Sequence, residues 1–132
     1  MESNKEFAER KALLDGQKAE LVRRAIEFAE HVNPDAWKKL GKTQFTSLLE
    51  ASTKACCVEE LQLFIKYKKS KKGSENWIYL SNGLCNQIDN LKSIADEVSE
   101  KAAKQIPDLH LELTRLFLGY FTWEACTRTT KK

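Results

Sequence analysis

Apolar residues recur at steps of three and four along most of the chain, and charged residues fill the positions between them. In its first part this repeat runs through Leu14, Leu21, Val22, Ala25, Ile26, Ala29 and Val32. Such spacing puts one apolar stripe along an α-helix. The pattern therefore predicts a helix over residues 3–32, which Gly16 loosens near its middle.

Turn-forming residues predict where this helix ends and where the next ones begin. Asn33 and Pro34 favour the start of a short helical turn, because asparagine caps a helix and proline fits its first position. Gly41 is expected to close that turn from the C-terminal side. Thr43 is a good N-cap for the helix that follows.

Two apolar groups come next along the chain. The first places Phe45, Leu48, Leu49 and Ser52 on one helix face, and the second predicts a further helix through Val58, Leu61, Phe64 and Ile65. Whether these helices are continuous stays open, since residues 52–57 also suit a tight bend.

Residues 77–80, Trp-Ile-Tyr-Leu, would suit a short strand before the turn signal Asn82–Gly83. No second strand is evident to pair with it, and a lone strand cannot satisfy its backbone hydrogen bonds. We therefore predict a helical entry and a long helix over about residues 81–104. Its apolar positions are Leu84, Ile88, Leu91, Ile94, Ala95 and Val98.

The last helix, predicted from Pro107 to about Thr127, is apolar nearly all round. One stripe contains Leu109, Leu113, Leu116, Phe117 and Tyr120, and other faces add Leu111, Leu118, Phe121 and Trp123. A helix of this kind is central in its bundle or covered by a partner. We expect it to pack centrally and to touch a neighbouring subunit through Leu118, Phe121 or Trp123.

Composition agrees with a helical bundle. Glycine and proline are scarce, at 5 and 2 residues, which favours long helices with short connections. Hydrophobic residues make up 42% and charged residues 31%, as in globular proteins. At 132 residues the chain is most economically one domain, residues 1–132. We predict an all-α bundle of five or six helices.

The chain offers little material for a metal site. Its four cysteines, Cys56, Cys57, Cys85 and Cys126, form no Cys-x-x-Cys pair, and His31 and His110 lack ligand spacing. Buried, reduced thiols of a cytoplasmic protein are the expected state. No metal site and no cofactor are expected. The opening residues, MESNKEFAERK, predict no signal peptide, and no apolar run is long enough to span a bilayer.

Enzyme motifs are also missing from the sequence. The glycines do not form a phosphate-binding loop, and no Gly-x-Ser-x-Gly elbow occurs. His31 falls at a predicted helix end, where an imidazole commonly faces the last carbonyls. His110 suits a surface or partner-facing role better than catalysis. We therefore expect no catalytic residues.

A run of lysines is the clearest functional signal. The stretch KYKKSKKGSENW carries Lys66, Lys68, Lys69, Lys71 and Lys72 beyond the end of an amphipathic helix. Part of this run suits a helix C-terminus or a solvated loop, because cations favour that end of the helix dipole. The net charge is only +3, so any nucleic-acid role must come from such local clustering.

Aromatic residues beside the lysines favour single-stranded nucleic acid. Tyr67 and Trp77 flank the run, and rings that are exposed stack on unpaired bases while lysines track the phosphates. Lys42, Arg115 and Arg128 are expected as weaker members of this surface. For Arg115 a pair with a carboxylate such as Glu112 is the competing interpretation.

With the helices placed, two stretches resemble a known family. KTQFTSLLEAS, residues 42–52, is similar to the Thr-x-x-Gln or Thr-Ser-Gln helix start of small subunits of type III CRISPR effector complexes. ELQLFIKYKKSKKGSENW, residues 60–77, resembles the apolar helix, basic run and tryptophan that follow there. The likeness covers roughly residues 40–125. The family phrase has an arginine shortly after the glutamine, where this chain has Thr46, and Lys42 would only partly replace it.

The resemblance implies a non-catalytic, all-helical subunit, several copies of which stack along a CRISPR RNA complex. Its partners would be CRISPR RNA or target RNA, other effector subunits and copies of itself. Contacts would go mainly to phosphates, so that guide pairing reads the sequence. The alternative is a helical protein–protein interaction module, an adaptor whose lysines bind an acidic partner without nucleic acid.

Overall fold

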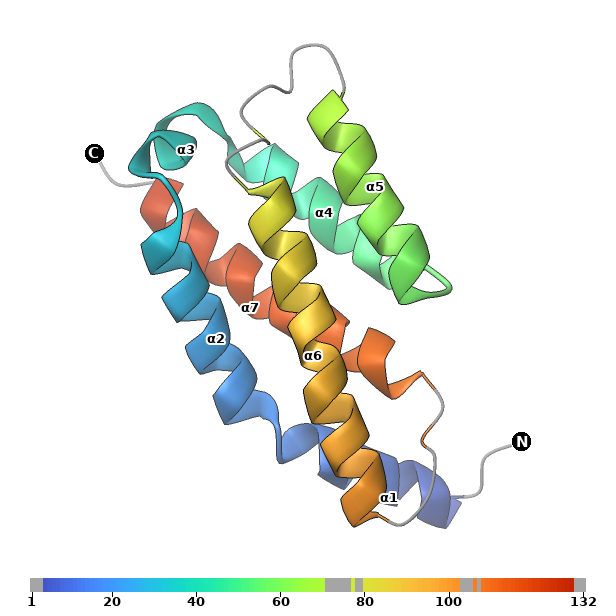
Figure 1. Ribbon diagram of the computed structural model, residues 1–132. Coiled ribbons are helices and arrows are strands. Elements are labelled where there is room, and N and C mark those ends of the chain that lie inside the picture. Colours follow the sequence, from blue (N-terminus) through green and yellow to red (C-terminus); the bar gives the residue numbers. More distant parts are fainter. Residues whose placement is uncertain (1–3, 71–76, 78–79, 103–105, 107, 130–132) are drawn as a thin grey trace.

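The structure, a computed structural model, describes residues 4–70, 77, 80–102, 106 and 108–129, with only the backbone described at Lys42, Lys69 and Ser70. This part of the chain contains helices and no strand (Figure 1). The helices are α1 (Asn4–Asp15), α2 (Lys18–His31), α3 (Pro34–Lys39), α4 (Lys42–Lys54), α5 (Val58–Ser70), α6 (Ser81–Lys101) and α7 (Leu109–Thr129). The predicted all-α fold is confirmed.

Helix α7 is the central element of the bundle. It packs against α2, α3, α4, α5 and α6, and Figure 1 shows it crossing the molecule behind α6, with α2 on one side and α4 on the other. Its buried residues spread over most of its circumference: Leu109, Leu111, Leu113, Thr114, Phe117, Leu118, Phe121, Thr122 and Ala125. The predicted central position follows from this distribution, because such a helix can be desolvated only by neighbours on several sides.

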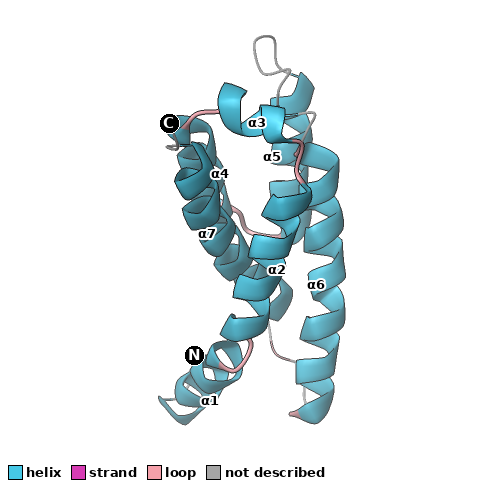
Figure 2. Ribbon diagram, turned by 90° about the vertical axis from the view of Figure 1, so that its left-hand side faces the viewer, coloured by secondary structure: helices cyan, strands magenta, loops and turns pink. Residues whose placement is uncertain are grey.

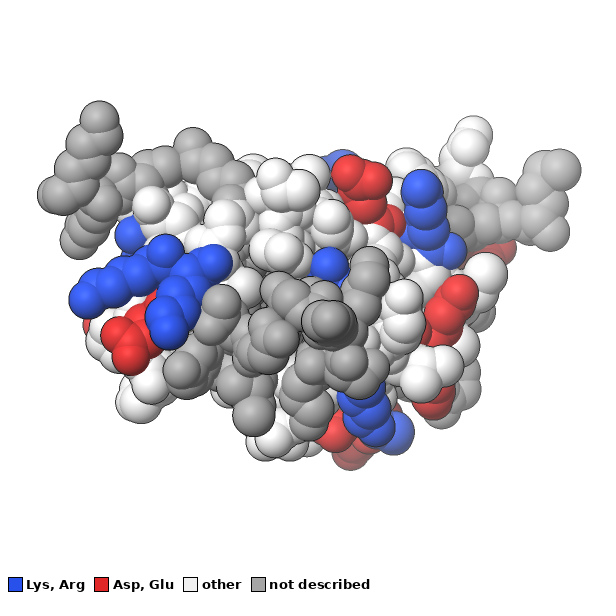
Figure 3. Space-filling view, turned by 90° about the horizontal axis from the view of Figure 1, so that it is seen from above, with Lys and Arg blue, Asp and Glu red and all other residues white. Residues whose placement is uncertain are grey.

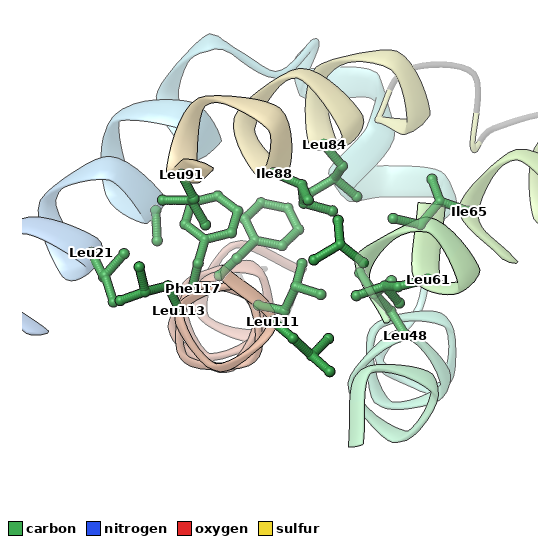
Figure 4. Close-up of a cluster of buried hydrophobic side chains, with 14 of the residues drawn as sticks. Leu21, Leu48, Leu61, Ile65, Leu84, Ile88, Leu91, Leu111, Leu113 and Phe117 are labelled. Atoms are coloured by element: carbon green, nitrogen blue, oxygen red, sulfur yellow. The ribbon is translucent and has the colours of Figure 1, made fainter. Parts of the chain in front are cut away.

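The core is built from the inward faces of the helices around α7. In Figure 4, Leu84, Ile88 and Leu91 of α6 point toward Phe117 and its neighbours on α7. On the other side, Leu48 of α4 lies with Leu61 and Ile65 of α5. Each of these seven side chains is at most 1% exposed. Full burial of one such side chain contributes about 1.5–3 kcal/mol.

An aromatic cluster joins four helices around one ring. Phe121 of α7 has its centroid 5.4 Å from that of Phe28, 6.3 Å from that of Trp37 and 5.9 Å from that of Phe45. Phe117 stacks on it at 6.4 Å. Tilted and edge-on pairs at these separations add to the burial energy, so Phe121 joins α2, α3 and α4 to α7.

The helix predicted over residues 3–32 is two helices. Gly16 and Gln17 separate α1 from α2, and the Gln17 N–H donates to Leu14 O at 3.0 Å in a tight turn. Figure 2 shows α1 bent away from the bundle, and α1 contains no buried residue. Glycine weakens a helix interior, and α1 lacks the apolar face that could hold it in line with α2. The other six described helices form the bundle itself.

One predicted cap is confirmed and two need correction. The Asn33 side chain accepts the N–H of Asp35 at 2.9 Å, and Pro34 takes the first position of α3, as expected. Gly41 does not close α3, because Leu40 is its C-cap. Gly41 instead occupies the N-cap of α4 in an extended conformation, and Thr43 already lies inside that helix.

The question of continuity between α4 and α5 is settled by a bend at residues 55–57. Ala55 ends α4 with an extended backbone, and its N–H still donates to Ala51 O. The Glu60 carboxylate accepts the Cys56 N–H at 2.7 Å, and Cys57 O accepts the N–H of Leu61 at 3.4 Å. These bonds satisfy backbone groups at the start of α5 and set α4 and α5 side by side.

The two long helices are close to their predicted ranges. Helix α6 ends at Lys101 rather than Lys104, and α7 begins at Leu109. Pro107 lies outside the described residues. Asp108, just before α7, has φ 58°, and its carbonyl accepts the Glu112 N–H at 2.9 Å. At the entry to α6, the Leu80 N–H donates to Trp77 O at 2.9 Å.

Two helical glycines provide a matched test of packing. A Cβ on Gly83 of α6 would come within 2.6 Å of a ring carbon of Phe28, whereas a Cβ on Gly119 of α7 would meet only Leu49 Cδ1 at 4.0 Å. We expect Gly83→Ala to destabilise the fold by about 1–3 kcal/mol through overpacking. We expect Gly119→Ala to stabilise it by up to about 1 kcal/mol through helix propensity.

Urea unfolding of the two variants and the wild type measures both effects. A Gly83→Ala protein as stable as Gly119→Ala would show that the Phe28 ring moves aside freely and that the α2–α6 contact is loosely packed.

Candidate nucleic-acid interface

The described part of the lysine run forms the C-terminal turns of α5. Lys66 is exposed, Tyr67 is 54% exposed and Lys68 is half-buried. The backbone of Lys69 belongs to α5, but its side chain is not described. Lys71 and Lys72 lie outside the described residues. The structure therefore places two of the five predicted lysine side chains at one end of α5, next to an exposed aromatic ring.

Trp77 is not the exposed stacking ring that the sequence suggested. It is 0% exposed, and its indole N–H donates to the Gln44 side-chain oxygen at 2.9 Å. Its centroid lies 6.5 Å from that of Phe45, and the Lys68 Nζ lies 5.8 Å from the Trp77 ring centroid. Burial of the ring became possible because Gln44 supplies the acceptor that a buried indole needs. Trp77 thus anchors the chain to the start of α4.

A groove lies between α4 and α5, beside Tyr67. Its volume is about 430 Å³, within the range of small-molecule clefts. It is lined by Ser47, Glu50, Ala51, Lys54 and Ala55 from the side of α4, and by Glu60, Leu61, Phe64, Tyr67 and Lys68 of α5. Two aromatic rings and two lysines on one concave surface can hold a flat ring together with a negative charge.

Sequence reasoning did not assemble this groove. The spacing of Glu50 and Lys54, and of Glu60, Phe64 and Tyr67, puts each set on one helix face. The sequence therefore already indicated which residues share a face within each helix. Only the bend at residues 55–57, however, turns the two faces toward each other.

Arg115 is held by the protein itself. Its Nε donates to Ser52 O at 2.8 Å and its Nη2 to Ala55 O at 2.9 Å, at the C-terminal end of α4. Its Nη1 pairs with Glu112, one turn earlier on α7. The guanidinium fork therefore satisfies carbonyls that the end of α4 leaves without helical partners. The pair with Glu112 was the competing interpretation, and this geometry supports it over a contact with nucleic acid.

Other basic residues are also engaged within the protein. Arg128 donates to Glu124 at 2.8 Å, and its Cζ lies 5.9 Å from the Trp37 ring centroid. On α2, hydrogen bonds from Arg23, and then from Arg24, hold the pKa of Glu20 below its ordinary value. Lys42 is the first residue of α4, and its side chain lies outside the described residues.

Figure 3 shows the end of the molecule that carries α3. On this face the lysine and arginine side chains of the described residues lie in separate groups, and acidic side chains adjoin several of them. Among these residues the face has no single continuous basic surface. On this face, an interface built from the described residues would therefore be local, in keeping with the small net charge of +3.

Of the three residues predicted for a partner interface, one is exposed. Leu118 and Phe121 are both 0% exposed and belong to the core, so neither can contact a neighbouring subunit without unfolding. Their side of α7 faces the other helices of the bundle. Trp123 is 69% exposed, and its ring packs edge-on against Tyr120 at 5.7 Å. Of the three predicted interface residues, Trp123 is therefore the one whose side chain is accessible to another molecule.

The cysteines and histidines have local structural surroundings. Cys56 and Cys57 are exposed in the bend between α4 and α5, against the expectation of burial, while Cys85 and Cys126 are half-buried. All four are free thiols. A ring nitrogen of His31 lies 2.7 Å from Glu27 O, and one of His110 lies 2.7 Å from Ile88 O. Within the described ranges, no group of His, Cys, Asp and Glu side chains could hold a metal ion.

Comparison with known proteins returned nothing. No protein-family model, no curated protein and no solved structure matches this chain. Among the helices that the structure describes, none is long and apolar enough to cross a membrane.

The contacts of Arg115 predict a structural effect of its substitution. We expect Arg115→Lys to lower the free energy of unfolding by about 1–3 kcal/mol, because a single ammonium cannot reach Ser52, Ala55 and Glu112 together. Lys66→Ala is the matched control, since an exposed lysine should matter by less than about 0.5 kcal/mol. Urea unfolding checks both variants. If Arg115→Lys is as stable as the wild type but binds RNA more weakly, Arg115 contacts the RNA and its structural role is excluded.

Proposed function

We propose that this chain is a non-catalytic helical subunit of a CRISPR RNA-guided effector complex, where it lines the path of target RNA or another single strand. The observation that carries the proposal is the end of α5, where Tyr67 and Lys68 line the groove against α4 and the exposed Lys66 directly precedes them. Lysines beside an exposed ring combine phosphate attraction with base stacking. Part of the attraction is release of counterions from the strand.

The two stretches that carry the family resemblance also meet in space. Gln44 belongs to the first stretch and Trp77 ends the second, and their side chains are hydrogen-bonded at 2.9 Å. Helix α5 and most of α4, the two helices that line the groove, lie between them in the sequence. This hydrogen bond supports the view that both stretches are parts of one structural unit.

A second candidate function is a helical protein–protein interaction module without nucleic acid. The exposed ring of Trp123 favours it, because large exposed aromatic residues are enriched where proteins bind each other. The two candidates are compatible in one respect. A subunit of a ribonucleoprotein complex needs a protein contact, such as one through Trp123, in addition to its contact with RNA. An adaptor would need the protein contact only.

Salt-dependent RNA binding tests the first candidate. We expect a variant with Lys66, Lys68, Lys69, Lys71 and Lys72 changed to alanine to bind single-stranded RNA more weakly and nearly uniformly across sequences. Its slope of log affinity against log salt should fall by about one for each phosphate-binding lysine that is removed. Gel shifts over a salt series measure both quantities, in the assembled complex if the isolated chain binds too weakly. Equal affinity and equal slope for the variant and the wild type would contradict the proposal.

Trp123 provides a separate test of assembly. We expect Trp123→Glu to leave the monomer folded, because the side chain is 69% exposed, and to block association with neighbouring subunits. Light scattering after size-exclusion chromatography measures the association, and circular dichroism checks the fold. Asn86→Glu, at an exposed position of α6, is the control, because it adds the same single negative charge. Unchanged association of Trp123→Glu would exclude Trp123 from the interface.

A further inference from the structure

We infer that the groove between α4 and α5 holds one unpaired nucleobase of a bound strand, stacked on Tyr67. The inference rests on the proposed function and names the part of the ligand that this groove takes. The groove would bind the base of a nucleotide, whereas the lysines would bind the phosphates of the strand.

The aromatic residues of the groove suit a flat ring. Phe64 and Tyr67 lie three positions apart on α5, so their side chains share one helix face. Phe64 is half-buried and packs against the core, which fixes its position. Tyr67 is 54% exposed and lines the groove. A base that enters the groove would stack on the Tyr67 ring, next to the Phe64 ring that the core holds in place.

The charges of the groove decide what class of ligand fits. Lys54 and Lys68 line it together with Glu50 and Glu60. An acidic protein segment would bring carboxylates against Glu50 and Glu60, which costs free energy at short range. A nucleotide separates its two parts: the uncharged base can lie beside the carboxylates while the phosphate meets a lysine. This charge pattern favours a nucleotide over an acidic peptide.

Glu50 further indicates which bases are preferred. Glu60 already accepts the backbone N–H of Cys56 at 2.7 Å, whereas Glu50 is exposed on α4 at the groove. A carboxylate accepts hydrogen bonds from amino groups such as cytosine N4. Uracil has no exocyclic amino group. Cytosine-containing strands should therefore bind better than uracil-containing strands of the same length.

The polar groove between α2 and α6 lacks this combination. It is lined by Arg23 and Arg24, but both are paired with Glu20. Its aromatic rings are those of Phe28, which packs against Phe121 in the core, and of His31, which lies with one ring nitrogen 2.7 Å from Glu27 O. The α4–α5 groove is thus the better of the two for a stacked base.

The test compares strands with and without bases on the full chain. The probes are an oligocytidine RNA, an oligouridine RNA and an abasic ribose-phosphate oligomer, all of equal length. For the wild type we expect oligocytidine to bind about tenfold or more tightly than the abasic oligomer, with oligouridine between them. Tyr67→Ala should remove most of that difference and keep the salt slope. Tyr67→Phe, which keeps the ring, should retain it, and Glu50→Gln should reduce the preference for cytosine over uracil.

The outcomes separate this inference from the proposed function. Equal wild-type affinity for the oligocytidine and the abasic oligomer would overturn the base-binding groove and leave the phosphate-binding surface standing. The same holds if Tyr67→Ala, folded by circular dichroism, keeps the full difference. Failure of the wild type to bind any of the three probes, even in the assembled complex, would overturn both proposals. Binding of an acidic peptide in the groove instead would overturn the base-binding groove and favour the adaptor function.

Discussion

The enclosure of α7 is the constraint on which the rest of the structure depends. This helix carries apolar residues on most of its circumference, so it cannot lie at the surface of a stable monomer. Five helices pack around it, and the ring of Phe121 touches aromatic residues from α2, α3 and α4. Burial of this one helix thus determines where the other helices must lie. Trp123 is the large apolar side chain of α7 that this packing leaves exposed.

The positions of α4 and α5 at the candidate interface depend on contacts with the core. Helix α4 is held at its C-terminal end by Arg115 of α7, which donates to the carbonyls of Ser52 and Ala55. Near its start, Gln44 accepts the indole N–H of Trp77, at the entry to α6. Because both ends of α4 are fixed and the bend at residues 55–57 is hydrogen-bonded, α5 lies in a defined position against α4. The groove is lined by residues of these two helices.

Four arginines of the protein have other surroundings than the lysines at the end of α5. Arg23, Arg24, Arg115 and Arg128 each pair with a glutamate on their own helix, and Arg115 also caps a neighbouring helix. The planar guanidinium suits such bidentate, fixed contacts. The lysines of α5 are compact charges on flexible stems at a helix end. In the proposed function, they would meet a ligand whose phosphates vary in position, as those of a single strand do. A nearly neutral chain can in this way keep a local basic surface.

The sequence by itself determined the features that depend on neighbours along the chain. Helical spacing, the Asn33 cap and the all-round apolar character of the last helix are local patterns, and they correctly predicted an all-α bundle with that helix at its centre. Tertiary structure alone decided which aromatic side chains are exposed: Tyr67 and Trp123 lie at the surface, while Trp77 and Phe121 are buried. It also decided the partners of Arg115, whose acceptor at Ala55 lies 60 residues earlier in the chain. The physical reason is that burial and long-range hydrogen bonds depend on which helices pack together, and a pattern within one helix does not contain that information.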